Sequence, residues 1–199
     1  MSKGYKKAAI DLETTGCDET KHHIFQIAGR IIDLDGTVIE KFNFKFRPIS
    51  LLEYDDEALK VVGVTLDELK NLPMSAEQAY NELIELLSCY CNRYDSKDKY
   101  QFIAYNAGFD SRFLREFFKH MGDNYYGSWF WNPAICVMQA IAMFVLDVRG
   151  SIPNFKLETL CQAAGISWDE SKAHDADYDI EQTMQLFDYV RENTRILGE

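Results

Sequence analysis

Short apolar runs alternate with longer amphipathic segments along the chain, and this pattern predicts a sheet covered by helices. KKAAIDLE, near the N-terminus, predicts a short buried strand. IFQIAGRIIDLDG and TVIEKFNFKF predict two further strands, and the Asp35-Gly36 pair between them favours a hairpin turn. QFIAY, residues 101–105, predicts a central strand. These strands and the helices that follow indicate a mixed α/β sheet.

Five helices follow from apolar stripes and end signals. The first is expected over residues 76–91 with Ser75 as its N-cap, and the second after residue 105. Asn132-Pro133 is expected to open a helix that runs to about Leu146, with Pro at the first helical position. Helices over residues 156–164, before Gly165, and over 176–192 complete the series.

The remaining segments contain no repeat or low-complexity linker, so we expect one domain spanning residues 1–199. Residues 47–75 are expected to form the one long loop. YYGSWFW, residues 125–131, predicts strand and core rather than a base-stacking platform, although part of it could face a dimer partner.

The chain has 199 residues, 47% of them hydrophobic, which is enough for a substantial core. Its five cysteines form no CxxC pair, so we expect reduced thiols and a cytoplasmic location. No apolar run has the length of a signal or membrane span, and we expect no membrane association. A net charge of −11 argues against a broad grip on duplex nucleic acid but leaves room for binding a strand end.

Three acidic clusters stand out. In the first, IDLETTG, Asp11 and Glu13 lie two residues apart on a strand and project from one face. Two carboxylates on one face repel each other unless a cation lies between them, and a divalent metal ion is the usual solution. The alternative is a strand end that runs into a polar turn.

The second cluster is YNAGFD. Asp110 opens a helix whose Phe113 and Leu114, three and four residues on, belong to the core stripe, so its carboxylate lies over the buried side. The alternative is an acidic residue that interacts with the helix dipole.

The third cluster is HDADYD. A calcium loop would need glycine at its sixth position and glutamate at its twelfth, but counting from Asp175 places Ile180 and Leu186 there. The calcium interpretation therefore fails. Asp175 can cap the helix and Asp177 suits its first turn. Asp179 lies one turn further in.

On that helix Asp179 shares a face with Ala176, Thr183 and Leu186. The small side chain of Ala176 leaves room for a ligand to approach. His174 precedes the helix and could lean over the same place, or it could be an ordinary surface residue.

Taken together, DLETTG, NAGFD and HDADYD resemble the three motifs of the DEDD family of 3′→5′ exonucleases, in its histidine subclass. That family includes ribonuclease T, oligoribonuclease and a polymerase III proofreading subunit. The signature positions are filled by Asp11, Glu13, Asp110, His174 and Asp179. FKLETLCQAAGI also resembles the segment before the third motif. Asn132, Cys136 and Ile180 depart from residues common in the family.

The resemblance implies a ribonuclease H-like fold, a five-stranded mixed sheet with the second strand antiparallel to the rest and helices on both faces. It also implies hydrolysis of single-stranded DNA or RNA from 3′ ends, releasing nucleoside 5′-monophosphates. Asp11, Glu13, Asp110 and Asp179 would hold two divalent ions, Mg²⁺ or Mn²⁺, with His174 as general base. The terminal nucleotide would bind near five residues: Leu12, Thr14, Thr15, Asn106 and Phe109.

Two questions stay open at this level. A catalytically inactive scaffold of the same fold is the alternative to an enzyme, although none of the signature acids is missing. The stripe Arg112, Arg115, Lys119 could guide a strand into the partner's site of a homodimer, or it could be a solvated helix face.

Overall fold

A computed structural model describes residues 5–173 and 175–193 and contains a sheet of strand order β4-β3-β2-β1-β5-β6. Strand β2 is antiparallel to both neighbours, whereas β1 with β5, β5 with β6 and β3 with β4 are parallel pairs. The strands are β1 (Lys7–Thr14), β2 (Ile24–Ile32), β3 (Val38–Arg47), β4 (Met74–Ser75), β5 (Gln101–Ala104) and β6 (Ile135–Cys136). The expected mixed sheet with an antiparallel second strand is confirmed, and the two-residue β4 brings its strands to six.

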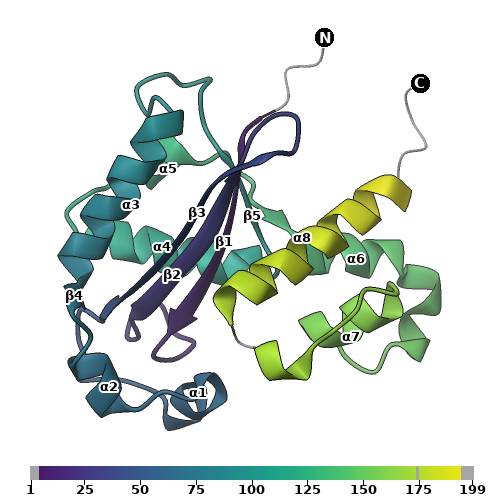
Figure 1. Ribbon diagram of the computed structural model, residues 1–199, viewed down its shortest axis with the longest axis horizontal. Coiled ribbons are helices and arrows are strands. Elements are labelled where there is room, and N and C mark those ends of the chain that lie inside the picture. The colour runs from purple at the N-terminus through teal and green to yellow at the C-terminus, as the bar shows by residue number, and fades with distance from the viewer. Residues whose placement is uncertain (1–4, 174, 194–199) are drawn as a thin grey trace.

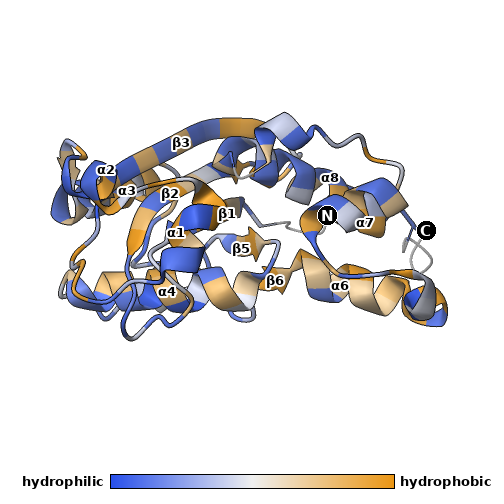
Figure 2. Cartoon of the chain, turned by 90° about the horizontal axis from the view of Figure 1, so that it is seen from below, coloured by the Kyte–Doolittle hydropathy of each residue, from blue (hydrophilic) through white to orange (hydrophobic). Residues whose placement is uncertain are grey.

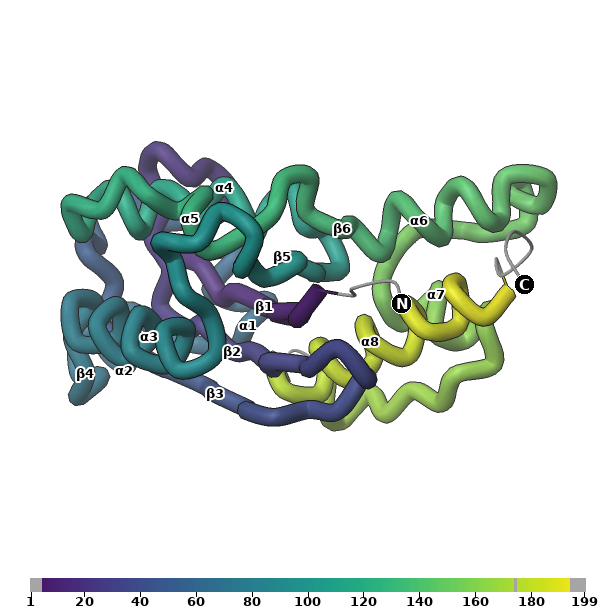
Figure 3. The backbone as a smooth tube through the Cα atoms, turned by 90° about the horizontal axis from the view of Figure 1, so that it is seen from above, coloured from purple at the N-terminus to yellow at the C-terminus, as the bar shows by residue number. Residues whose placement is uncertain are grey.

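The helices cover both faces of this sheet, as Figure 1 shows. They are α1 (Asp56–Val62), α2 (Leu66–Lys70), α3 (Ala76–Tyr90), α4 (Ala107–His120), α5 (Tyr126–Trp129), α6 (Val137–Phe144), α7 (Leu157–Ala163) and α8 (Ala176–Asn193), with short 3-10 turns η1 (Leu146–Ser151) and η2 (Glu170–Lys172). Seen along the sheet edge, α3 and α4 lie at one end, and α6, α7 and α8 lie at the other (Figures 2 and 3).

Strand β1 supplies side chains to two different layers. Ala8, Ile10 and Leu12 belong to the core that α3 and α4 complete, whereas Ala9 packs against α8. Because successive strand residues point to opposite faces, Asp11 projects to the face that α8 covers. Because of this alternation, one strand contributes residues both to the core and to the face that holds Asp11.

The contact between α8 and the sheet uses small residues. Ala9 of β1, Ala28 of β2 and Ala176 of α8 are each 1% exposed and pack in one cluster with Ile32 and Ile180. Short side chains on both surfaces allow the helix axis to lie close to the strands. The first turns of α8 are thereby held over the ends of the central strands.

The ends of several helices agree with the sequence. The side chain of Ser75 accepts a hydrogen bond from the Gln78 backbone amide, and the Gln78 side chain accepts one from the Ser75 backbone amide, so the expected N-cap is a full capping box. Gly165, beyond the end of α7, has φ 74°, a left-handed conformation that glycine adopts without strain.

Three local expectations are wrong. Residues 47–75 contain two short helices, α1 and α2, capped by Asp55 and Thr65. The helix expected from Pro133 begins at Val137 instead, because Ile135 and Cys136 pair with β5 and draw the chain into the sheet first.

The third concerns residues 125–131, which form α5 rather than a strand, apart from one bridge between Phe130 and Tyr100. Its expected core role is confirmed, since Tyr126, Trp129 and Phe130 are buried.

Across the described residues, none of the helices combines the length and the apolar character needed to cross a membrane.

Candidate active site

The carboxyl end of β1 places Asp11 and Glu13 on the face covered by α8. Across the antiparallel pair, Asp11 lies opposite Ala28 and Glu13 opposite Gln26. The register shifts between Glu13 and Thr14, where the strand leaves the sheet. Such irregularities bend a strand and redirect its side chains. The two acids are therefore held at the point where β1 ends.

Asp110 reaches the same region from the first turn of α4. Its residue is 5% exposed, and it accepts a hydrogen bond from the backbone N–H of Leu12. Phe113 and Leu114, its i+3 and i+4 neighbours, are 1% and 0% exposed, so the expected buried side of the helix is confirmed. Asp110 is thus tied directly to the strand between Asp11 and Glu13.

Asp179 comes from the first turn of α8. Its face neighbours Ala176, Thr183 and Leu186 are all buried, and Asp179 itself is partly buried. The helix start is defined by Asp175, whose Oδ1 accepts hydrogen bonds from the amides of Asp177 and Tyr178, both at 3.1 Å. The expected capping role of Asp175 is confirmed. His174 lies outside the described residues.

These carboxyl groups perturb one another. Burial raises the pKa of Asp11 well above its usual range, and repulsion from Asp110, Glu13 and Asp179 adds to it. Burial and the charges of Asp179 and Asp110 raise the pKa of Glu13 to about 8, against a partial opposing effect from Lys45. Acids from three segments that lie far apart in the sequence therefore meet in one electrostatic cluster.

The burial of Asp110 raises its pKa to about 7, because the backbone hydrogen bonds that it accepts only partly offset the loss of water. In sequence order the four acids come from β1, β1, α4 and α8. The fold therefore brings all three acidic clusters to one place, and each of the first three acids holds its proton far more tightly than an exposed carboxyl group.

The donor set suits a hard divalent cation. It consists of carboxylate oxygens alone, the ligands that Mg²⁺ and Mn²⁺ prefer, and a bound cation would relieve the mutual repulsion that raises these pKa values. Within residues 5–173 and 175–193, no group of three or more His, Cys, Asp or Glu side chains is already arranged to hold an ion.

The expected nucleotide-contacting residues differ in accessibility. Leu12 is 6% exposed and packs in the core. The Thr14 hydroxyl donates to the Gly16 carbonyl at 2.7 Å, and the Thr15 hydroxyl accepts from the His23 amide at 3.0 Å. Each of these three side chains thus has a structural role in the fold.

Asn106 and Phe109 offer more surface to a ligand. Asn106 is exposed at the N-cap position of α4, where its side chain makes no capping hydrogen bond. Phe109 is partly buried, with its ring 4.6 Å from that of Phe113. The start of α4 thus presents an amide group and an aromatic ring beside Asp110.

The basic stripe on α4 is engaged within the chain. Arg112 forms an ion pair with Glu19 at 3.1 Å, and Lys119 forms one with Glu116. The Arg115 guanidinium lies 4.5 Å from the centre of the Tyr126 ring. These contacts favour the solvated helix face over a path for a strand.

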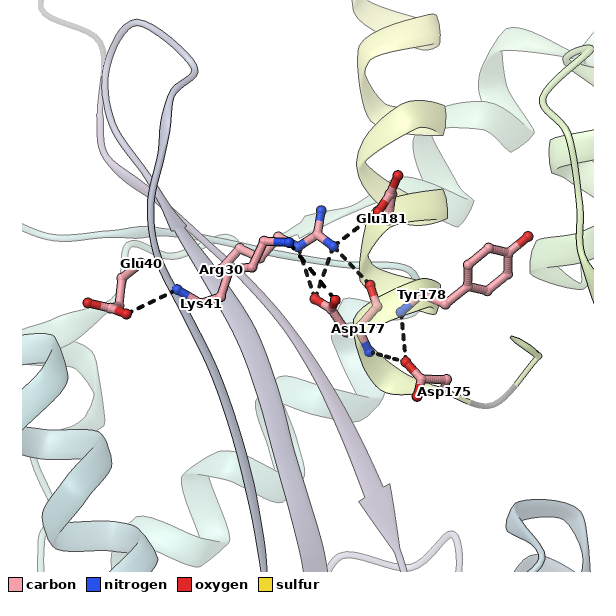
Figure 4. A network of polar contacts seen from close by, with 7 residues as sticks. All are labelled: Arg30, Glu40, Lys41, Asp175, Asp177, Tyr178 and Glu181. Atoms are coloured by element: carbon pink, nitrogen blue, oxygen red, sulfur yellow. Dashed lines mark hydrogen bonds and ion pairs between the residues drawn. The ribbon is translucent and has the colours of Figure 1, made fainter. Parts of the chain in front are cut away.

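One network was not expected from the sequence. Arg30, in the middle of β2, reaches α8 and binds Asp177 and Glu181 (Figure 4). The available signal was an arginine inside the apolar run IFQIAGRII, but its acidic partners lie 147 and 151 residues away. The sequence marks the cation as unusual without indicating its partners.

Comparison with known proteins places the chain in a family. A family model described as an exonuclease, RNase_T, matches residues 8–187. Ribonuclease T of Histophilus somni is 27% identical over 203 residues, covering 98% of this chain and 88% of that protein. Ribonuclease T of Haemophilus influenzae is 27% identical over 206 residues, with 98% and 83% covered.

Solved structures share the fold. The nuclease domain of 3′hExo, a DEDDh family member bound to rAMP, superposes with a TM-score of 0.72 at 18% identity and covers 99% of this chain and 96% of that one. An Escherichia coli exonuclease I complex with single-stranded DNA gives 0.76 at 22% identity, and the match covers 97% of this chain but 42% of the larger protein. The chain belongs to the RNase T exonuclease family, the DEDD-type 3′→5′ exonucleases that its three motifs resemble.

Proposed function

We propose that this exonuclease depends on divalent metal ions and removes nucleotides from the 3′ ends of single-stranded DNA or RNA as nucleoside 5′-monophosphates. The observation that carries the proposal is the meeting of Asp11, Glu13 and Asp110 with Asp179, whose charges raise the pKa values of Asp11 and Glu13. A cluster of buried acids without a matching group of basic side chains is suited to cations.

Asp11, Glu13, Asp110 and Asp179 would hold two ions, Mg²⁺ or Mn²⁺. Such ions, when bound, favour deprotonation of the attacking water and stabilise the leaving 3′-oxygen. The carboxylates keep them at the end of β1, beside the start of α4. Because the ligands must be deprotonated, raised pKa values make ion binding weaker as the pH falls.

His174 would accept the proton of the attacking water. An imidazole changes protonation near neutral pH, which suits a general base. Its position next to Asp175, the residue that caps α8, supports this role, because the capped end of α8 lies within two turns of Asp179. The imidazole would hold this proton as an imidazolium ion, while the carboxylates remain ionised.

The terminal nucleotide would lie at the start of α4. Phe109 supplies an apolar ring for a base and Asn106 an amide for hydrogen bonding, and an aromatic face accepts any base. Leu12, Thr14 and Thr15 would shape the opposite wall through the backbone that their side chains fix. A site with this contact set suits single strands more than duplexes.

Two further expectations accompany the proposal. A cytoplasmic location agrees with the five cysteines, all of which are free thiols. Some members of the family are dimers, and light scattering of the purified protein measures whether this chain also forms one.

The test uses short RNA and DNA strands of matched sequence, labelled at the 5′ end, in single-stranded and duplex form. We expect products that shorten one nucleotide at a time with Mg²⁺ or Mn²⁺ and no cleavage in a chelator. Asp11→Ala should abolish both cleavage and tight Mn²⁺ binding, whereas Glu85→Ala, at an exposed position of α3, should change neither.

Two outcomes contradict the proposal. Binding of the strands without cleavage under every metal condition identifies an inactive scaffold. Cleavage by Asp11→Ala at the wild-type rate removes the carboxylate cluster from the mechanism.

A further inference from the structure

Arg30 is a buried cation in a strand of apolar residues. It lies opposite Ala9 in the β1–β2 pair, on the same sheet face as Asp11, and its residue is 7% exposed. A buried guanidinium is costly unless its donors are satisfied. Its contacts therefore explain why the position is compatible with the fold.

Within the part of the chain that the structure describes, the acceptors of Arg30 all belong to α8. Its Nε and Nη2 donate to Oδ1 of Asp177 at 3.3 and 3.0 Å, and Nη2 also donates to the Asp177 carbonyl at 3.1 Å. Nη2 reaches Oε2 of Glu181 at 3.3 Å. Figure 4 shows the guanidinium between these two acids, which lie one turn apart on the helix. One strand residue thus grips two successive turns of α8.

The position of these acids bears on Asp179. Each residue turns a helix by about 100°, so Asp177 and Glu181 share one side and Asp179, midway between them, points to the opposite side. That side faces the cluster: Thr183, one turn beyond Asp179 on the same side of the helix, lines one small pocket together with Asp11. Asp179 also contributes to the raised pKa values of Asp11 and Glu13. Rotation of α8 about its axis would move both sides together.

The apolar contacts of the first turns of α8 define their rotation less sharply than the contacts further along the helix, where Leu186, Phe187 and Val190 are buried. The helix rests on the sheet through Ala176 and Ile180, against Ala9 and Ala28. Small flat side chains provide close contact but few interlocking shapes, whereas several directed hydrogen bonds from one guanidinium define an orientation.

We propose that Arg30 is a positioning residue that sets the rotation of the first turns of α8 and so directs Asp179 toward Asp11 and Glu13. This inference rests on the proposed function, in which Asp179 helps to hold the metal ions. Arg30 touches neither reacting atoms nor ions in this scheme and acts through Asp177 and Glu181.

The energetics favour orientation over stability as the reason for Arg30. The side chains of Asp177 and Glu181 are 51% and 53% exposed, and ion pairs with exposed partners add little to stability. Replacing a buried charge and its pairs by an apolar side chain is often neutral or stabilising. Methionine at position 30 would pack beside Ile32 and Ile180.

The experiment compares wild type with Arg30→Met, Arg30→Lys and the double variant Asp177→Asn/Glu181→Gln. Calorimetry measures Mn²⁺ affinity, thermal unfolding measures stability, and amide hydrogen exchange of the metal-free proteins measures opening of the first turns of α8. Asp188→Asn is the matched control, because it removes an exposed acid from the same helix, one paired only with Arg191 among the ion pairs of the described residues.

We expect Arg30→Met to remain folded and to bind Mn²⁺ about 10- to 100-fold more weakly, the range typical of residues that orient metal ligands. Arg30→Lys should recover part of the affinity. The double variant should resemble Arg30→Met, and combining all three changes should add no further loss, because they break the same contacts. Asp188→Asn should match wild type.

Unchanged Mn²⁺ affinity in folded Arg30→Met overturns the inference, and so does a loss of affinity that the double variant does not share. If Arg30→Met does not fold, Arg30→Lys and the double variant decide in the same way. If wild type neither binds Mn²⁺ nor cleaves, the proposed function fails. The role of Arg30 is then tested by amide hydrogen exchange of the metal-free Arg30→Met variant. Faster exchange confined to the first turns of α8 supports the role of Arg30 in holding the helix, and unchanged exchange overturns it.

Discussion

The two sides of α8 use the same residue type in opposite ways. On the side toward β2, Asp177 and Glu181 face the guanidinium of Arg30. On the side toward β1, Asp179 faces Asp11 and Glu13, whose pKa values it helps to raise. Acids with a fixed cation hold the helix in place, whereas acids that face one another raise one another's pKa values and, under the proposed function, would hold a cation from solution.

The difference follows from the strands beneath the helix. Position 30 of β2 carries a long basic side chain, and position 11 of β1 carries another acid. Helix sequence alone places Asp177 and Asp179 on different faces but does not indicate the partner of either acid. The role of each acid depends on the strand residue that it faces, Arg30 for Asp177 and Asp11 for Asp179.

The largest expected effect is at Asp179. Asp179→Asn keeps the shape of the side chain but removes one charge from the β1 side, so exonuclease activity should fall by at least about 10³-fold and Mn²⁺ affinity should fall with it. Single-turnover cleavage and calorimetry measure the two losses. An equal loss of activity in Asp177→Asn would contradict the different roles of the two sides of α8.

His174→Ala should have the next largest effect and should separate proton transfer from ion binding. Turnover should fall by about 10²- to 10⁴-fold, the usual contribution of a general base, while Mn²⁺ affinity stays close to that of wild type. The pH–rate profile of the variant should also lack the rise in rate that accompanies deprotonation of the imidazole. A parallel loss of Mn²⁺ affinity would instead make His174 part of the ion site.

A smaller effect is expected on the pH dependence of stability in the metal-free protein. The pKa of Glu13 is about 8 in the folded chain and 4.5 ordinarily, so the folded state binds more protons between these values. Its contribution to stability is complete below the lower value and is lost as the pH rises through the higher one. Metal-free protein should therefore melt at lower temperature as the pH increases across this window.

Glu13→Gln should make that pH dependence shallower and raise the free energy of unfolding at about pH 8 by about 1 kcal/mol or more. Thermal unfolding at a series of pH values, with a chelator present, measures this change in stability, and Glu85→Gln is the control. An unchanged slope would mean that Glu13 is not held among like charges. Saturating Mn²⁺ should oppose the trend, because ion binding strengthens as the carboxylates lose protons.

The sequence predicted most of the sheet and the elements that carry the acids, because those segments have strong local signals. The Asp35-Gly36 turn, the apolar alternation of β1 and the capping box at Ser75 each act over a few residues. Contacts across layers were less accessible. The partners of Arg30 are distant in sequence, and pairing of Ile135 with Ile103 overrode the helix start that Pro133 suggested.

The two-sided use of strand β1 also limits which insertions and deletions the chain can tolerate. Adjacent residues of the strand serve the core and the site in alternation, with Leu12 in the core between Asp11 and Glu13. Inserting or deleting one residue before Asp11 would exchange the two sets, burying carboxylates among Ala79 and Phe102 and presenting Leu12 to the nucleic acid. A substitution along β1 alters one of the two surfaces at one position, whereas a change in its length exchanges both.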